Sequence, residues 1–396
     1  MSPARSGGVN RRIPAADSRR PAVPGRECYP VAASPLTEVT LRRSILPALP
    51  PIFMLTMLAA SCSKPAPPAP AAQPAPTINQ ASLQAFAPLP DAVPAARASS
   101  PAMIDLGRML FYEPRLSKSQ KISCNSCHDL ATYGVDNQPT SDGHKGQRGT
   151  RNSPSVYNAA GHFAQFWDGR APDVEAQAKG PVLNPVEMAM PGEARVVAVL
   201  TSMPDYVDAF TKAFPNEPKP VTYDNMAKAI GAFERKLMTP SRWDALLKGD
   251  TTALTAEEKV GFETFVDSGC ATCHNGALLG GGSYQRIGLA KAFPRVADGG
   301  RMNITKAEAD KAVFKVPSLR NVEKTGPYFH DGGTPTLEQA IRDMGEYQLG
   351  ASLADKQVRE IADFLKALTG KVDAGYVKAP ALPKSTAKTP KPEEGS

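Results

Sequence analysis

Two short stretches hold the residues best suited to chemistry, and both have the pattern Cys-x-x-Cys-His. The first spans 124–128 and the second spans 270–274. Each thiol of such a pattern can form a thioether bond to a haem vinyl group, and the adjacent imidazole can bind the iron. A single Cys-x-x-Cys pair would also suit a zinc site, a redox dithiol or a structural disulfide. Two pairs, each followed by His, favour haem, because a zinc site built from the four cysteines would leave both histidines unexplained. The sequence therefore predicts two covalent c-type haems, attached through Cys124, Cys127, His128, Cys270, Cys273 and His274.

The second ligand of each iron decides what a haem can do, since two strong ligands favour electron transfer and an open position permits chemistry. For the second motif, Met344 follows His274 at the end of a helix expected over 337–344. The separation of Met344 from His274 is usual for the thioether ligand of a small cytochrome c domain. A methionine that fills a gap in the core is the alternative interpretation. Met302, which lies much closer to His274 in sequence, is a rival ligand.

Spacing alone does not identify the second ligand at the first motif. Met188 and Met190 follow His128 at a separation that makes both of them candidates. His144 lies much nearer to His128 in sequence, in a loop over 140–149 that contains three glycines. Such a loop can move easily. From composition alone, a solvated loop histidine is the commoner interpretation of His144.

A helix is expected shortly before each motif. Ser100 and Pro101 have the residue types of a helix start, and apolar residues continue on one face ahead of the first motif. Thr255 and Glu258 form the pattern of a capping box ahead of the second. Further apolar stripes predict helices over 225–238 and 353–368, the latter ending at Gly370. No run alternates for long enough to predict a sheet, so the expected fold is all-α, with two cytochrome c-like domains and long loops.

Both ends of the chain differ in composition from the middle. Residues 1–62 predict an export or lipoprotein signal region, because two arginines precede a short apolar run and small residues precede Cys62. Lipidation would then anchor the protein through Cys62, with plain secretion as the alternative. A Pro/Ala-rich linker is expected over 63–99, the first haem domain over 100–245 and the second over 246–370. Residues 371–396 predict a disordered tail.

Composition excludes one class of partner. The chain has 396 residues, a formal net charge of +7 and a pI near 9.0. Much of this positive charge lies in the two terminal segments rather than along one element. We therefore expect no nucleic-acid partner.

The middle of the chain, residues 100–370, resembles the bacterial dihaem cytochrome c peroxidase family. Besides the two haem motifs, the matching segments are Leu110–Ser117, Arg151–Ser155, Gln165–Ala171, Asn184–Met188, Val316–Asn321, Pro327–Gly332 and Met344–Leu349. The resemblance implies reduction of hydrogen peroxide to water at the first haem. Electrons would come from a small periplasmic cytochrome c or blue-copper protein and enter at the second haem. The alternatives are a non-enzymatic dihaem electron carrier and a related oxidase of protein side chains, which has Tyr at the position of Met344.

The resemblance also implies roles for single residues. Met344 matches the second ligand of the electron-transfer haem, and His144 matches a displaceable ligand of the peroxidatic haem. Glu187 matches the acid–base residue that moves a proton between the peroxide oxygens. Trp167 matches an aromatic residue between the haems, and core packing is its alternative role.

A calcium ion between the domains is a further implication of the resemblance. The side chain of Asn152 and the carbonyl oxygens of Thr325 and Pro327 match its ligands, and oxygen-only ligation suits calcium. The family is often dimeric, although no apolar stripe in this sequence predicts a dimer interface.

Overall fold

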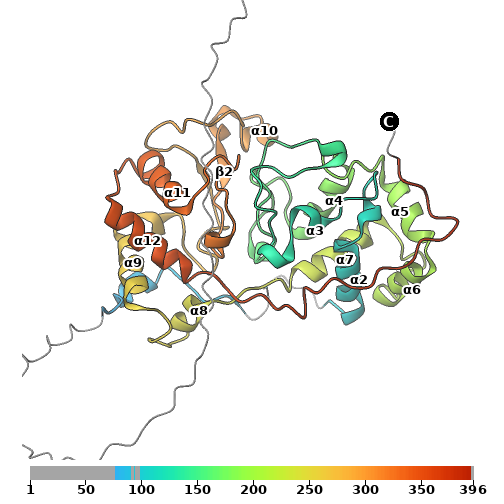
Figure 1. The fold of residues 1–396 in the computed structure, drawn as a ribbon, viewed down its shortest axis with the longest axis horizontal. Helices are drawn as coiled ribbons and strands as arrows, with labels where there is room; N and C mark the ends of the chain where they lie inside the picture. Colours follow the sequence, from blue (N-terminus) through green and yellow to red (C-terminus); the bar gives the residue numbers. More distant parts are fainter. Residues whose placement is uncertain (1–75, 91–92, 94–98, 394–396) are drawn as a thin grey trace, which may run out of the picture. The chain divides into compact units, whose positions relative to one another are not determined.

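The computed structural model describes residues 76–90, 93 and 99–393 (Figure 1). The predicted signal region and Cys62 lie outside the described residues. Part of the predicted linker is folded, because α1 (Gln80–Leu83) is followed by the buried residues Phe86 and Leu89. The ring of Phe86 lies edge-on to Trp243 at 5.5 Å between centroids. The linker prediction is therefore wrong over this stretch, since a few aromatic and aliphatic side chains in a Pro/Ala-rich segment are enough to anchor it.

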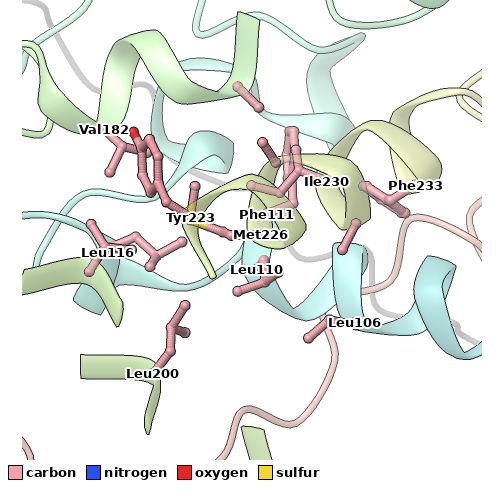
Figure 2. Packing of buried hydrophobic residues seen from close by; sticks show 14 of the residues in the cluster. Leu106, Leu110, Phe111, Leu116, Val182, Leu200, Tyr223, Met226, Ile230 and Phe233 are labelled. Atoms are coloured by element: carbon pink, nitrogen blue, oxygen red, sulfur yellow. The ribbon is translucent and has the colours of Figure 1, made fainter. Parts of the chain in front are cut away.

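A first hydrophobic core is built from helices that surround the first haem motif. The helices are α2 (Pro101–Phe111), α4 (Val174–Leu183), α5 (Glu193–Thr201), α6 (Pro204–Ala213) and α7 (Tyr223–Glu234). Figure 2 shows Leu110 and Phe111 of α2 beside Ile230 and Phe233 of α7. Burial of these side chains supplies the main stabilisation of this region, on the order of 1.5–3 kcal/mol each.

A second core is separate from the first and surrounds the second motif. Its helices are α8 (Arg242–Leu247), α9 (Ala256–Asp267), α11 (Leu337–Asp343) and α12 (Asp355–Lys366), with a π-helical turn at Met344–Leu349. Trp243, Phe262 and Phe364 are fully buried and meet at centroid distances of 4.9 to 5.2 Å. Figure 1 shows these helices grouped apart from α2 and α4–α7.

The described residues also form several short elements outside the main helices. Two strands, β1 (Tyr284–Arg286) and β2 (Val313–Lys315), pair antiparallel with Tyr284 opposite Lys315. Three-residue strands are too short to produce a visible alternation, which explains why the sequence did not predict them. The remaining helical turns are α3 (Cys124–Cys127), α10 (Met302–Thr305) and the 3₁₀ turns Pro114–Leu116, Leu130–Thr132, His144–Gly146, Ala159–Gly161, Cys270–Thr272, Glu308–Asp310 and Val322–Lys324.

The two helix starts predicted at Ser100 and Thr255 are confirmed, whereas the helices expected over 225–238 and 353–368 run instead over Tyr223–Glu234 and Asp355–Lys366. Ser100 Oγ accepts the Met103 N–H at 3.2 Å, and Thr255 with Glu258 forms the capping box. The last helix ends at Lys366 instead of at Gly370. A Cβ atom at Gly370 would lie 2.0 Å from the Thr239 carbonyl oxygen. Glycine is therefore needed there for close backbone packing and not for a helix cap.

Residues 372–393, here called the C-terminal strap, return from the second core to cover the first. Tyr376 stacks on Phe233 with ring centroids 5.1 Å apart and donates a hydrogen bond to the Phe233 carbonyl. Further hydrogen bonds fix the strap at Val377 and Pro383, whose carbonyl oxygens accept from Tyr112 and Arg115. The predicted disordered tail is wrong for these residues, because a proline-rich segment keeps its carbonyl acceptors and one tyrosine supplies an apolar anchor.

No helix within the described residues is both long enough and apolar enough to span a bilayer.

Candidate active site

The first haem motif lies on the single helical turn α3. The turn is capped reciprocally by Ser123 and Ser126, and the His128 N–H donates to the Cys124 carbonyl at 2.9 Å. Burial raises the pKa of the Cys124 thiol and raises that of Cys127 to about 11. A redox dithiol is favoured by a lowered thiol pKa, so the raised values of Cys124 and Cys127 argue against that interpretation of the first motif.

His144 lies in a tight turn that packs against the loop of Glu187. The His144 N–H donates to the Glu187 carbonyl at 2.7 Å. A Cβ atom at Gly143 would lie only 1.9 Å from the Val186 carbonyl oxygen, so the two loops meet backbone to backbone. These contacts place His144 beside the residue that the family resemblance assigns to proton transfer.

The imidazole of His144 is buried without a hydrogen-bond partner. The residue is 4% exposed, and neither ring nitrogen has a partner. Burial and the nearby charges of Lys145 and Lys118 lower the pKa of His144, which keeps the ring neutral. Unpartnered buried nitrogens are rare and call for an explanation. The composition-based expectation of a solvated loop histidine is therefore wrong, and a neutral imidazole of this kind can offer a lone pair to a metal.

The Glu187 carboxyl is held within a small polar environment beside the first motif. Asn184 Nδ2 donates to Glu187 Oε1 at 2.7 Å. Burial raises the pKa of Glu187, and the charge of Arg170 and the Asn184 hydrogen bond oppose this effect. The Glu187 charge in turn raises the pKa of Cys127, while a hydrogen bond with Ser141 lowers it. Both loops therefore border the first motif.

Trp167 connects the first half of the sequence to the second motif. Its indole N–H donates to the Asn152 carbonyl at 2.9 Å, and its own carbonyl accepts the Lys315 N–H at 2.7 Å. The ring lies edge-on to Phe314 and His330, each 6.5 Å away between centroids. Trp167 also lines the cavity that contains the second motif.

An ion-pair chain that sequence analysis did not assign runs beside Trp167. Asp168 is 3% exposed and accepts from Arg170 at 3.1 Å and from Arg151 at 2.6 Å. Arg151 also pairs with both oxygens of Asp298, which follows the second motif in sequence. Asp168, Arg170 and Arg151 belong to segments that matched the family, and that match was the only signal available for them. The chain of ion pairs connects the environment of Glu187, through Arg170, to the second half.

The second motif opens into a cavity of about 250 Å³. His274 Nδ1 lies 3.2 Å from the Leu279 carbonyl oxygen. A carbonyl only accepts, so Nδ1 carries the proton and Nε2 keeps a free lone pair. Residues that line the cavity with Cys270, Cys273 and His274 include Met344 and the aliphatic side chains Val316, Leu319, Ile341, Ile361 and Leu365. A mostly apolar cavity with two thiols, a free imidazole nitrogen and a thioether fits a c-type haem.

Of the two methionines that could bind the second iron, Met344 lines this cavity and Met302 does not. Met344 begins the π-helical turn that directly follows α11. Met302 begins α10 and is not among the residues that line the cavity. Met188 and Met190 are buried in the first core, where they pack among its aliphatic residues.

The three residues matched to a calcium site border the same cavity. Asn152, Thr325 and Pro327 all line the cavity, although Asn152 comes from the first half of the sequence and the other two from the second. Asn152 Nδ2 donates to the Gln138 carbonyl at 3.0 Å, which leaves Oδ1 as the atom that could bind a cation. Groups of three or more His, Cys, Asp or Glu residues that could hold a metal ion do not occur in the described part of the chain.

Comparisons with known proteins agree on one family. A family model described as di-haem cytochrome c peroxidase matches residues 101–252. The chain is 49% identical to a cytochrome c551 peroxidase of Pseudomonas aeruginosa over 317 residues, which cover 78% of this chain and 90% of the relative. It is 50% identical to a cytochrome c551 peroxidase of Nitrosomonas europaea over 291 residues, which cover 73% of this chain and 86% of the relative.

The chain belongs to the dihaem cytochrome c peroxidase family. It is a peroxidase, and the family implies two haem cofactors. The predicted resemblance and the predicted enzyme class are confirmed.

A solved structure supports the fold of the peroxidase. A MauG-like protein associated with microbial copper homeostasis has a TM-score of 0.68 and 28% identity to this chain, and the match covers 74% of this chain and 98% of that protein. The helix-rich part of the predicted fold is therefore confirmed, and two short strands are added to it.

Proposed function

We propose that the peroxidase reduces hydrogen peroxide to two molecules of water at the first motif. The two electrons come from a small c-type cytochrome or a blue-copper protein and enter at the second motif, and two protons complete the balance. A haem at each motif, when bound, would supply the redox-active iron. The observation that best supports this proposal is the position of His144. It is buried beside Glu187, and neither of its ring nitrogens has a hydrogen-bond partner.

In this proposal, the first haem would be held by His128 with Cys124 and Cys127, and the second by His274 and Met344 with Cys270 and Cys273. His144 would cap the first iron in the resting protein and withdraw to admit peroxide. Its turn spans only three residues, and four hydrogen bonds that hold it involve Gln147. A single turn of this kind can rearrange without unfolding either core.

Glu187 is the proton-transfer residue of the proposal. Burial raises the pKa of Glu187, which favours the protonated carboxyl, and the charge of Arg170 opposes this effect. A group balanced in this way can take a proton from one peroxide oxygen and give it to the other. Asn184 fixes the carboxyl orientation through its hydrogen bond to Oε1.

Trp167 and a calcium ion would join the two halves. The contacts of Trp167 with both sequence halves support a role between the two haems. Calcium would be bound by Asn152 Oδ1 and by the carbonyl oxygens of Thr325 and Pro327, with water completing its shell. Chelation with EGTA should then weaken turnover, and calcium but not magnesium should restore it.

We also propose that the peroxidase is periplasmic and anchored by lipid at Cys62. The motif ahead of Cys62 supports this location. Labelling with a fatty-acid analogue in cells should tag the parent protein and spare the Cys62→Ala variant. Labelling of neither protein would favour plain secretion.

A spectrum of the half-reduced protein with calcium tests the proposed function. Reduction of the second haem alone should produce a high-spin signal at the first haem and allow rapid reaction with hydrogen peroxide. A first haem that stays six-coordinate, together with no peroxide consumption, would instead favour an electron carrier.

A further inference from the structure

Lys315 is a buried cation without an acidic partner. It ends β2, is 7% exposed and lines the cavity of the second motif. Its ammonium lies 2.8 Å from His162 Nδ1 and pairs with no carboxylate in the described part of the chain. Burial lowers the pKa of Lys315 to about 8. An uncompensated buried ammonium is costly, so a compensating anion is expected nearby.

His162 presents a second donor at the same place. A charged ammonium only donates, so Nδ1 of His162 accepts from Lys315 and the ring proton lies on Nε2. Nε2 is buried and has no partner. The backbone of Gly281 packs closely against the ring, because a Cβ atom added at Gly281 would lie 2.5 Å from His162 Cδ2. This N–H therefore has a fixed position and needs an acceptor that the protein does not supply.

The other two cations of the cavity wall differ from Lys315, because Arg320 has a carboxylate partner and Arg286 is only half-buried. Arg320 pairs with both oxygens of Asp244 at 2.5 and 2.9 Å. Arg286 donates to the Ala309 carbonyl at 2.9 Å. None of the residues that line the cavity is Asp or Glu. Lys315 and His162 are thus two adjacent hydrogen-bond donors in a mostly apolar cavity, and no acidic residue lines that cavity to accept from them.

We propose that Lys315 and His162 form the binding site for a propionate carboxylate of the haem attached at Cys270 and Cys273. The inference rests on the proposed attachment of haem at this motif. Haem is an apolar macrocycle with two carboxylate side chains, which matches a mostly apolar cavity that contains a buried cation without an acidic partner. The ammonium donates a charge-assisted hydrogen bond to the carboxylate, and the His162 Nε2–H donates another.

The site has a consequence for the second haem's redox potential. A positive charge retained beside a haem disfavours the more positive ferric state, so it raises the reduction potential. His162 comes from the first half of the sequence and Lys315 from the second. The potential of the electron-transfer haem is therefore set partly by a residue from the other half.

Redox titration of the holoprotein tests this inference. Lys315→Met should lower the midpoint potential of the second haem and leave that of the first unchanged. Lys315→Arg should keep a value near the parent's. Lys311→Met is the matched control, because Lys311 is exposed, precedes β2 and pairs with Glu308 on the surface. Equal midpoints in Lys315→Met and Lys311→Met would overturn the inference.

Two further measurements keep the test decisive. Lys315→Gln replaces Lys315→Met if the latter fails to fold, because Gln keeps a hydrogen-bond donor and lacks the charge. It should also lower the midpoint potential of the second haem. An unchanged midpoint potential would count against the site. A crystal structure of the haem-loaded parent should place a propionate oxygen within about 4 Å of Lys315 Nζ, and both propionates lying elsewhere would overturn it. Haem content is measured on the parent first. Fewer than two haems per chain would refute the proposed function itself, whereas two haems with no shift would refute only the propionate site.

Discussion

The two candidate iron ligands come from different kinds of structure. His144 lies in a one-turn loop segment with Lys145 at a φ of 59°, whereas Met344 lies at a junction between an α-helix and a π-helical turn. The Met344 N–H donates to carbonyl oxygens of the preceding helix, at Ala340 and Ile341. The His144 turn is held by the His144 N–H on the Glu187 carbonyl and by the hydrogen bonds of Gln147. In the proposed function, the element that carries each ligand would decide whether that ligand is permanent or removable.

Glu187→Gln should have the largest effect, because it removes the proposed proton-transfer group beside His144. Peroxide turnover should fall by roughly 10²- to 10⁴-fold, with both haem spectra nearly unchanged. Stopped-flow consumption of peroxide by the half-reduced protein measures the loss. Glu193→Gln, an exposed position on α5, is the control. Full activity in Glu187→Gln would remove this residue from the mechanism.

Met344→His should have the next largest effect, and it tests the proposed ligand of the second haem. An imidazole in place of the thioether lowers the potential of the second haem. Each loss of about 59 mV makes electron acceptance from the donor about tenfold less favourable. Spectroelectrochemistry and donor-driven turnover measure both effects. Met302→His should change neither, and an equal effect there would reverse the assignment of the ligand.

Each core contains a buried glutamate, and the two glutamates differ in whether they have an ion-pair partner. Glu234 of the first core is 4% exposed, and burial together with Glu175 raises its pKa to about 8. Glu258 of the second core is 6% exposed but pairs with Arg242. The folded first core therefore keeps a proton that the unfolded chain releases above about pH 4.5, so stability falls as pH rises from 4.5 to 8.

Glu234→Gln should remove this fall in stability, which we expect to be about 1–3 kcal/mol in size. Urea unfolding followed by far-ultraviolet circular dichroism at pH 5 and pH 8 measures it. Glu258→Gln should instead destabilise the protein at both pH values, because it removes the charge that pairs with the half-exposed Arg242. A parent protein equally stable at both pH values would contradict the prediction for Glu234.

Tyr376→Phe should have the smallest effect. It removes one hydrogen bond to the Phe233 carbonyl and keeps the stacked ring, so a loss of about 1 kcal/mol is expected. Tyr376→Ala also removes the ring and should cost more. Hydrogen exchange should show the loss in α2 and α7 but not in α9 and α12. Equal loss in both cores would show that the strap does not act on the first core alone.

Local chemistry made some features predictable from sequence, and long-range packing hid others. Ser100 and Thr255 act within a single helical turn, so the helix starts could be predicted. His144 and Glu187 are distant in sequence and meet only through loop packing, so only family resemblance identified them. Lys315 and His162 are 153 positions apart, and neither type suggests a pair. The C-terminal strap was wrongly predicted because proline-rich composition does not reveal which surface its carbonyl oxygens will meet.

The strap also makes the first core depend on a segment that follows the second core in sequence. Tyr376 comes after α12, yet its ring stacks on Phe233 of α7. A cut in the backbone between α12 and Tyr376 would therefore loosen the first core while leaving every helix of both cores in one piece.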